Sequence, residues 1–299
     1  MKHSRYGILH AGTSIPNFMK LVHSIAETRA LCRSARSSGA RLGLVPTMGA
    51  LHEGHLSLVK AARAKSDLVA ASIFVNPAQF GPSEDFAKYP RALQNDCALF
   101  EQAGVELVFV PSVEEMYPKG AVTWVVVEGL SDRLCGKSRP GHFRGVTTVV
   151  AKLFHIVEPD VAFFGQKDGA QVAIIQRAVR DLNMPVTIEV CPIVRETDGL
   201  AISSRNAYLS PSGRKSALVL YRSLMRIQRL FASGEHDSAN LIAAAKQEFA
   251  AEPAVRLDYI EVVDPESLEP ETVVTRRALA AVAAFVGQTR LIDNILLEP

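Results

Sequence analysis

The segment Leu44–His55 constrains this chain most, because it joins a short apolar run to a helical pattern through proline, threonine and glycine. Gly49 and Gly54 let the backbone approach a ligand closely. Residues 56–64 have the spacing of a helix, so the segment predicts a strand, a tight loop and a helix N-terminus. Such an N-terminus carries unpaired N–H groups and a partial positive charge, which together favour phosphate.

His52 and His55 lie three residues apart, on one face of the first turn of this predicted helix. Two imidazoles there can donate hydrogen bonds to phosphate oxygens as charge builds up during a displacement. Two other interpretations stay open. The pair could belong to a metal site, although no third ligand lies at a familiar spacing, or the histidines could have no chemical role.

Composition limits the classes of protein to consider. A length of 299 residues suits about two domains. The formal net charge of +2 gives no electrostatic argument for a nucleic-acid or membrane partner. The four cysteines are scattered and favour reduced thiols in a cytoplasmic protein. Residues 1–16 lack the apolar core of a secretory signal, and we expect a loose leader there.

Strands alternate with helices from residue 17 to residue 193, which predicts an α/β fold with a doubly wound, Rossmann-like parallel sheet. The predicted helices are 17–39, 54–65, 91–103, 145–157 and 171–181, and the predicted strands are 41–45, 67–75, 105–110, 124–127, 161–164 and 186–190. Residues 194–299 predict a smaller α+β domain, with helices over 210–233 and 238–251 and strands over 257–263, 280–286 and 289–295.

Four more polar clusters lie near the ends of these elements, at residues 76–80, 139–145, 165–171 and 203–206. Each would be ordinary surface if it stood alone. In a doubly wound sheet, however, ligands bind beyond the carboxyl ends of the strands. The clusters are therefore expected to meet the helix N-terminus at one site.

With these residues in view, the chain resembles the pantoate–β-alanine ligase family over about residues 17–299. The matching segments, in chain order, are 46–49, 52–55, 74–80, 89–91, 164–168, 203–206 and 289–294. The element from His52 to His55 is also similar to the signature of the wider nucleotidylyltransferase and class I aminoacyl-tRNA synthetase group. There it marks chemistry at the α-phosphate of ATP, and Ser203–Arg205 looks like the counterpart of that group's second signature.

The resemblance implies a two-step reaction within coenzyme A biosynthesis. The carboxylate of (R)-pantoate attacks the α-phosphorus of ATP, giving pantoyl adenylate and pyrophosphate. The amine of β-alanine then attacks the activated carbonyl, and AMP leaves with formation of pantothenate. Mg²⁺ would arrive with ATP, because it prefers phosphate oxygens and water to a full protein cage. The family also implies a homodimer.

The resemblance assigns roles residue by residue. His55 corresponds to the catalytic proton donor, and His52, Lys167 and Arg205 are the other catalytic candidates, the last two as permanent charges beside the phosphates. Gln79, Gln171 and Arg139 would bind pantoate, with Gln79 also binding β-alanine, since an amide offers donors and an acceptor. The ATP-binding candidates are Met48, Gly49, Ala50, Leu51, His52, Glu53, Gly54, His55, Gly165, Gln166, Lys167, Asp168, Val194, Ile202, Ser203, Ser204 and Arg205.

Some features depart from the family pattern. Gly169 and Ala170 stand where the family commonly has an aromatic residue and a glutamine, and Ile202 stands where methionine or leucine is usual. These departures affect the shape of the pocket and leave the reaction as expected. The polar loop from Gly81 to Pro90 follows Gln79, and we expect it to close over the acyl adenylate.

Two alternative functions remain at this point. The chain could be a nucleotidyltransferase that passes AMP to a phosphate ester, but Gln79 and Gln171 suit a carboxylate substrate better than a phosphate, which would favour more lysine or arginine. It could also be a nucleotide-binding module without catalysis, although four residues argue against that: His52, His55, Lys167 and Arg205.

Overall fold

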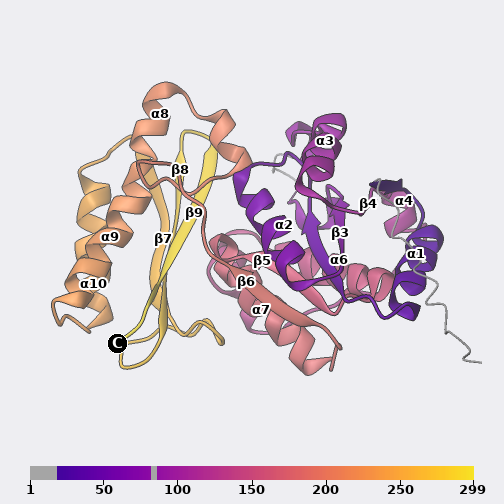
Figure 1. The fold of residues 1–299 in the computed structure, drawn as a ribbon. Coiled ribbons are helices and arrows are strands. Elements are labelled where there is room, and N and C mark those ends of the chain that lie inside the picture. Colours follow the sequence, from indigo (N-terminus) through magenta and orange to yellow (C-terminus); the bar gives the residue numbers. More distant parts are fainter. Residues whose placement is uncertain (1–18, 82–85) are drawn as a thin grey trace, which may run out of the picture.

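The structure is a computed structural model that describes residues 19–81 and 86–299, in two parts that lie side by side (Figure 1). The expected leader 1–16 and residues 82–85 of the expected closing loop lie outside the described residues. The first part is built on a six-stranded parallel sheet, as the alternation of strands and helices predicts. Its order is β1-β4-β3-β2-β5-β6, with β1 Lys20–Val22, β2 Leu42–Thr47, β3 Leu68–Ile73, β4 Leu107–Phe109, β5 Val161–Gly165 and β6 Thr187–Cys191.

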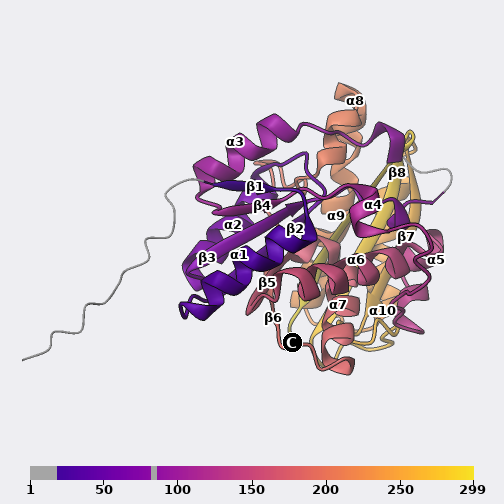
Figure 2. The ribbon, with the colours of Figure 1, turned by 90° about the vertical axis from the view of Figure 1, so that its right-hand side faces the viewer.

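Helices cover both faces of this sheet, so the doubly wound fold is confirmed. Alternate residues of β2 point to opposite faces: Leu44 packs with residues of α1, α6 and α7, whereas Val45 packs with residues of α2 and α3. Figure 2 views the molecule from the end that carries α1 and α4. The helices of this part are α1 Ile25–Ser37, α2 Glu53–Lys65, α3 Leu93–Ala103, α4 Val113–Met116, α5 Cys135–Ser138, α6 His142–Val157 and α7 Gly169–Asp181.

The second part is a three-stranded antiparallel sheet with helices α9 and α10 on the face turned away from the first part (Figure 1). Its strands pair in the order β7-β8-β9, and the middle strand serves two cores. Ala280 and Val282 of β8 pack with the α9 and α10 residues, whereas Leu279 and Ala281 belong to the core of the first part. The elements are α8 Pro211–Ser216, α9 Leu218–Ala232, α10 Ser238–Ala250, β7 Val255–Val263, β8 Ala278–Val286 and β9 Thr289–Leu297.

The prediction of one helix over 17–39 is wrong at its start. Residues Lys20–Val22 form strand β1, which pairs with β4, and the amide of Val110 donates to the carbonyl oxygen of Val22. Helix α1 begins only at Ile25, because the hydroxyl of Ser24 caps it by accepting from the Glu27 amide. The apolar residues of the strand happen to continue the helical spacing of α1.

The predicted strand at 124–127 is absent. The amide of Val125 donates to the hydroxyl of Thr148 at 3.0 Å, and the hydroxyl of Thr147 donates to the Val125 carbonyl at 2.6 Å. Side chains of α6 therefore take the place of a neighbouring strand for this residue. The predicted helix 210–233 is likewise divided into α8 and α9 at Ala217, where the Leu220 amide bonds back to the Ala217 carbonyl.

Among the described residues, no helix combines the length and the apolar composition that crossing a membrane requires. The part of the fold that matters for the site is the middle of the parallel sheet. Chain connections run to one side from β2 through β3 and to the other side through β5, so β2 and β5 flank the switch point of the sheet. Ligands bind at such a point in open α/β sheets.

Gly145 controls how closely α6 approaches the short 3-10 turn Pro77–Gln79. A Cβ atom at residue 145 would lie 2.2 Å from the carbonyl oxygen of Ala78 and 2.6 Å from the Gln79 nitrogen. We expect Gly145→Ala to lower the free energy of unfolding by about 1–3 kcal/mol or more, because backbone must move to admit the methyl group. Denaturant unfolding measures this.

Gly213→Ala in α8 is the matched control. A Cβ atom there meets only the side-chain atoms of Ser210 and Val286, both at 3.2 Å. The higher helix propensity of alanine should offset that contact, leaving stability within about 1 kcal/mol of the parent. Equal effects of the two substitutions would contradict the close approach of α6 to residues 77–79.

Candidate active site

The turn between β2 and α2 is held in shape by a buried carboxylate. Gly49 and Ala50 both have positive φ angles, +81° and +52°. The carboxylate of Asp96, on α3, accepts hydrogen bonds from the amides of Ala50 and Leu51, both at 2.9 Å, and is 1% exposed. A side chain at residue 49 would collide with that carboxylate, because its Cβ would lie 2.8 Å from Oδ2. Glycine at this position therefore satisfies both the backbone conformation and the packing.

The two histidines cap helix α2 and thereby fix their own tautomers. His52 is the N-cap residue, and its Nδ1 accepts from the Gly54 amide at 3.1 Å. The Nδ1 of His55 accepts from the His52 amide at 3.3 Å, which completes a capping box. An Nδ1 that accepts from a backbone amide carries no proton, so a neutral ring must carry its hydrogen on Nε2. Each imidazole therefore has an Nε2–H donor left for a ligand.

Both rings are neutral at physiological pH. Burial is the largest cause and lowers the pKa of His52 to about 4 and that of His55 to about 3. The positive charge of Lys167 lowers both values further. The two ring centroids lie 4.1 Å apart, so a positive charge on one ring would disfavour protonation of the other. The helix N-terminus thus presents two uncharged hydrogen-bond donors.

The loop after β5 brings a cation and an anion to the same place. Burial opposes the ionisation of Asp168, but the positive charges of Lys167 and Arg205 outweigh it, and the pKa of Asp168 is lowered. The Lys167 ammonium lies 3.5 Å from the Asp168 carboxylate. Asn294 of β9 fastens this loop, since its side-chain amide donates to the carbonyls of Gln166 and Lys167 at 2.9 and 3.0 Å.

The side chain of Gln79 is held next to the turn between β2 and α2. The residue is 9% exposed, and its carboxamide accepts from the Asn76 side chain at 3.1 Å and donates to the sulfur of Met48 at 3.0 Å. The Gln79 carbonyl accepts from Nδ1 of His142 at 2.8 Å, so the other ring nitrogen is the acceptor for the Arg139 guanidinium 2.9 Å away. A network thus connects the start of α6 to Gln79.

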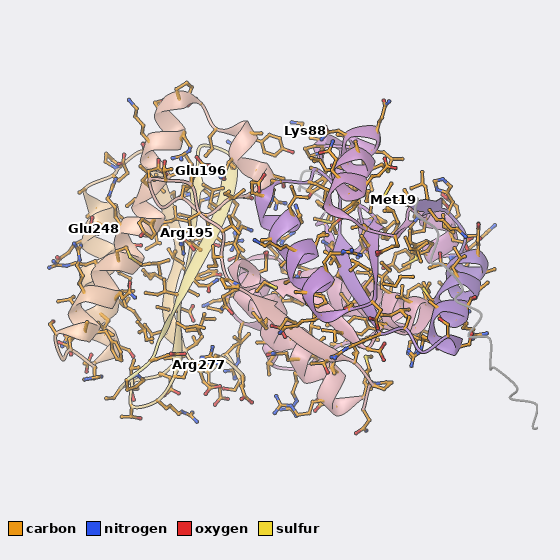
Figure 3. The ribbon with its side chains drawn as sticks, viewed as in Figure 1. Met19, Lys88, Arg195, Glu196, Glu248 and Arg277 are labelled. Atoms are coloured by element: carbon orange, nitrogen blue, oxygen red, sulfur yellow. The ribbon has the colours of Figure 1, made fainter. Side chains whose placement is uncertain are left out.

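The last cluster lies on a hairpin-like segment, residues 194–205, that joins the two parts of the molecule and is here called the excursion. The Ile202 amide donates to the Val194 carbonyl at 3.0 Å, so these two residues lie opposite each other. Arg195, labelled in Figure 3, makes a two-pronged ion pair with Asp293 of β9 at 2.6 and 2.9 Å. Because the Asp293 side chain is 2% exposed, this pair is a buried joint between the excursion and the C-terminal sheet.

These clusters surround one cavity of about 230 Å³ at the switch point of the sheet. The cavity opens into a cleft of about 1240 Å³ between the two parts of the molecule. The residues that line both spaces are Arg139, His142, Lys167, Asp168, Gln171, Ser203 and Arg205. A substrate in the cleft therefore meets cationic and amide side chains before it reaches the histidines.

Most residues that the sequence singles out line the smaller cavity. They are Met48, His52, Gly54, His55, Gln79, Arg139, Gly165, Lys167, Asp168, Gln171, Val194, Ile202, Ser203, Ser204 and Arg205. Gly49, Ala50, Leu51, Glu53 and Gln166 are not among the lining residues. Gly49, Ala50 and Leu51 instead shape the turn, and Gln166 faces Asn294 at 3.0 Å. The ligand each residue contacts stays a prediction.

Sequence reasoning missed four residues that hold the site together: Asp96, Asn76, His142 and Asn294. Asn76, His142 and Asn294 stand inside segments that the sequence analysis singled out, but no role was visible for them there. Asp96 gave no local signal, since an acidic residue in the first turn of a helix is commonplace. Its role depends on hydrogen bonds from Ala50 and Leu51, which lie 46 and 45 positions earlier in the chain.

The arrangement suits displacement at a polyphosphate. Two neutral N–H donors and the free amides of a helix N-terminus face the cavity beside Lys167 and Arg205, which can offset charge on phosphate oxygens. Asp168 is the only carboxylate among the described residues that line the cavity. It can accept from hydroxyl groups or contribute one oxygen to a cation that phosphates also hold.

Comparison with known proteins supports this chemistry. The family model for pantoate-beta-alanine ligase matches residues 20–296. A pantothenate synthetase of Koribacter versatilis is 58% identical over 280 residues, covering 94% of this chain and 96% of that protein. A pantothenate synthetase of Acidobacterium capsulatum is 60% identical over 290 residues, covering 93% of this chain and 97% of that protein.

Solved structures are similar over the same length. The crystal structure of pantothenate synthetase from Thermus thermophilus superposes with a TM-score of 0.89 at 48% identity, covering 94% of this chain and all of that one. Pantoate-beta-alanine ligase from Francisella tularensis, described as a complex with beta-gamma ATP and beta-alanine, has a TM-score of 0.75 at 33% identity. It covers 93% of this chain and 97% of that chain.

The depressed histidine pKa values predict a loss of stability in acid. A histidine in the unfolded chain has a pKa of 6.5, against about 4 and about 3 in the folded chain. Below pH 6.5 the unfolded chain therefore binds more protons, and the free energy of unfolding falls as the pH drops from 6.5 toward 4. Above pH 6.5 this contribution is constant. Denaturant unfolding across this range should show a steeper slope for the parent than for a His52→Gln, His55→Gln double variant.

Ring resonances provide the direct readout. In NMR titrations, the Cε1–H signals of His52 and His55 should keep their neutral shifts down to about pH 5. Titration of either buried ring near pH 6.5 would show that the cap does not hold it neutral.

Proposed function

The chain belongs to the pantoate–β-alanine ligase family, and on that premise we propose how its cavity carries out the reaction. It is an ATP-dependent ligase that condenses (R)-pantoate with β-alanine to pantothenate through pantoyl adenylate, releasing pyrophosphate and AMP. The single observation that carries the mechanism is the capped N-terminus of α2, where His52 and His55 each keep an Nε2–H donor beside Lys167.

In the first step, the triphosphate lies across the N-terminus of α2. The Nε2–H groups of His52 and His55 donate to oxygens of the reacting phosphates, and Lys167 and Arg205 balance the charge that moves to the departing pyrophosphate. Neutral rings act here as hydrogen-bond donors. The negative charge of bound phosphates favours the protonated ring, so it raises the pKa of His55 toward the range in which the ring can also give up a proton.

The remaining ATP-binding candidates hold the nucleoside. Asp168 accepts from ribose hydroxyls, and its lowered pKa keeps it ionised for that purpose. Val194, Ile202 and Ser203, on the excursion between the two parts, line the cavity. In this proposal they contact the base and sugar. Mg²⁺ would arrive with ATP, and Asp168 is the carboxylate among the described lining residues that could help to hold it and offset phosphate charge.

Pantoate lies between Gln79 and Gln171. Their amides match its hydroxyls and carboxylate, and Arg139, fixed by His142, supplies positive charge at the entrance to the cleft. The pantoate carboxylate attacks the α-phosphorus in line with the leaving pyrophosphate. In the second step, the β-alanine amine attacks the carbonyl of the adenylate, the bond to AMP breaks, and the amine loses a proton to water or to a phosphate oxygen.

We also propose the wider setting that the family implies. The protein is cytoplasmic and forms a homodimer. Residues 17–193 form the catalytic domain, residues 194–299 form the smaller domain, and residues 1–16 precede both. Within the smaller domain, the buried Arg195–Asp293 pair fixes the segment that carries Val194 and Ile202 to strand β9.

Replacement of His55 tests the first step. We expect His55→Ala to reduce pantoate-dependent exchange of labelled pyrophosphate into ATP by about 100-fold or more, because one positioned donor in such a site contributes that much. His155→Ala, on the exposed side of α6, should leave the exchange unchanged. Exchange near the parent rate in His55→Ala would remove this residue from the mechanism.

The His55→Gln variant separates catalysis from capping. Glutamine at the third position of a helix can accept from the N-cap amide, as His55 Nδ1 does, so the helix start should stay intact. Unfolding free energy near the parent value with strongly reduced exchange would support a chemical role. Parallel losses of stability and exchange in both variants would point to a structural role instead.

Gln171→Ala should weaken pantoate binding while ATP binding is largely kept. Truncation leaves pantoate oxygens unpaired in a partly dry cavity, at a cost of about 1–3 kcal/mol, whereas the nucleotide is held by other segments. Isothermal titration with each ligand separately measures the two affinities. Gln176→Ala lies on the same helix outside both cavities and is the control. Equal losses for ATP and pantoate in Gln171→Ala would contradict this division of the site.

A further inference from the structure

Strand β3 carries a single polar side chain, that of Ser72, and this side chain is buried. The residue is 1% exposed, and its hydroxyl has no hydrogen-bond partner among the described residues. A buried hydroxyl without a partner costs free energy, so such a group needs a ligand or an ordered water to complete it. Among the described residues that have an unpaired buried side-chain atom, Ser72 alone lines the smaller cavity. The partner of its hydroxyl is therefore expected to come from that cavity.

Ser72 points to the side of the sheet that helix α6 covers. Successive residues of a strand face opposite sides of a sheet. Ala71 and Ile73 pack with residues of α2 and α3, whereas Ala70 and Phe74 belong to the core that contains α6. Ser72 alternates with the first pair and so shares the orientation of the second. Its hydroxyl therefore lies between the sheet and α6.

The surroundings of Ser72 on this side are apolar. Its partners in the two neighbouring strands are Pro46 of β2 and Phe109 of β4. Helix α6 contributes three valines to the wall of the same cavity: Val146, Val149 and Val150. None of these side chains carries a hydrogen-bonding group. The Ser72 hydroxyl is thus a single polar point in an apolar wall.

The position of Ser72 is fixed relative to the catalytic turn. Strand β3 is paired on both sides, and the Ser72 carbonyl accepts from the Thr47 hydroxyl at 2.7 Å. The same hydroxyl accepts from the amide of Gly49, in the turn before α2, at 3.2 Å. The side chain of Ser72 can therefore change little except by rotation about its own Cα–Cβ bond. Groups held in this way on a strand position a ligand more precisely than groups on a loop.

The apolar wall belongs to the part of the cavity that the cleft does not share. Lys167 and Gln171 line both spaces, whereas Ser72, Pro46 and the three valines of α6 line only the smaller cavity. A charged group against such a wall would lose its hydration at a high cost, but a neutral hydroxyl loses little when it is paired. The ligand group that meets Ser72 is therefore an alcohol, which can donate and accept as serine does.

We propose that Ser72 binds the terminal hydroxyl of pantoate and thereby selects this acid over acids that lack that group. The inference rests on the proposed function and deepens it. In pantoate, a carbon with two methyl groups separates the carboxylate end from a terminal CH₂OH group. When the carboxylate is directed to the α-phosphorus, the methyl groups face the apolar wall and the terminal hydroxyl reaches Ser72.

The amide of Gln79 leaves part of pantoate unserved. Its oxygen already accepts from Asn76, and its nitrogen already donates to the sulfur of Met48. One N–H and one lone pair remain, which is fewer than the two hydroxyls and the carboxylate of pantoate require. Ser72 supplies a further donor and acceptor in the apolar part of the cavity.

The experiment measures how Ser72 affects the choice between pantoate and deoxypantoate, the analogue in which a methyl group replaces the terminal CH₂OH group. Acid-dependent exchange of labelled pyrophosphate into ATP gives kcat/KM for each acid in the first step alone. We expect Ser72→Ala to lower kcat/KM for pantoate by about tenfold or more, because the terminal hydroxyl is left unpaired. The value for deoxypantoate should stay near that of the parent, since this acid has no such hydrogen bond to lose.

Stability distinguishes a binding role from a structural one. Removal of a buried hydroxyl that has no partner in the free protein should leave the free energy of unfolding unchanged or raise it. Ser238→Ala in α10 is the matched control. Ser238 is also buried, its hydroxyl also lacks a partner among the described residues, and it lines neither cavity. This control should leave kcat/KM unchanged for both acids.

The outcomes separate this inference from the proposed function. No loss for pantoate in Ser72→Ala, or equal losses for the two acids, would overturn the role of Ser72 and leave the ligase assignment intact. A large loss of stability in Ser72→Ala would also overturn it, because the hydroxyl would then serve the fold. A parent without any pantoate-dependent exchange would instead remove the proposed function, and the role of Ser72 with it.

Discussion

Two neighbouring residues of β9 hold the C-terminal sheet against the catalytic loops, and the geometry of the cavity depends on them. Asp293 binds Arg195 through both carboxylate oxygens, and Asn294 binds the carbonyls of Gln166 and Lys167. The first contact fixes the excursion that carries residues 194–205, and the second fixes the loop after β5. A buried ion pair adds little to the free energy of unfolding by itself. Removal of one partner is costly, however, because the other charge stays buried with neither a counter-charge nor water beside it. The pair therefore fixes the excursion against the C-terminal sheet.

The capped helix shows how one set of atoms can serve folding and chemistry together. The Nδ1 atoms of His52 and His55 satisfy amides at the start of α2, which would otherwise be unpaired. By accepting those bonds they leave Nε2 as the only site for the proton of a neutral ring, so both donors face the cavity. Burial then keeps the rings uncharged. Asparagine or serine would cap the helix as well, but neither would leave an N–H donor at that distance from the backbone.

Sequence reasoning was most successful where the signal is local. The parallel sheet follows from the alternation of apolar strands and helices, and the α2 turn follows from Gly49, Gly54 and the two histidines. It failed where a long-range partner decides the structure. Strand β1 exists because β4 lies beside it. In the predicted strand 124–127, the main chain of Val125 bonds to hydroxyls of α6 and not to a neighbouring strand. The role of Asp96 appears only when α3 meets the turn. The resemblance to a family gathered the site residues, but the hydrogen bonds that orient them came only from the structure.

Helix α6 links the active site with the extended residues 121–127. Its first residue, His142, bonds to the Gln79 carbonyl, and Gly145 lets the helix lie against the backbone of residues 77–79. Within the next turn Thr147 and Thr148 bond to Val125, while Arg144 stacks on Trp124. A helix is stiff over so short a span, so α6 connects Trp124 and Val125 to the backbone of Gln79 through packed contacts alone.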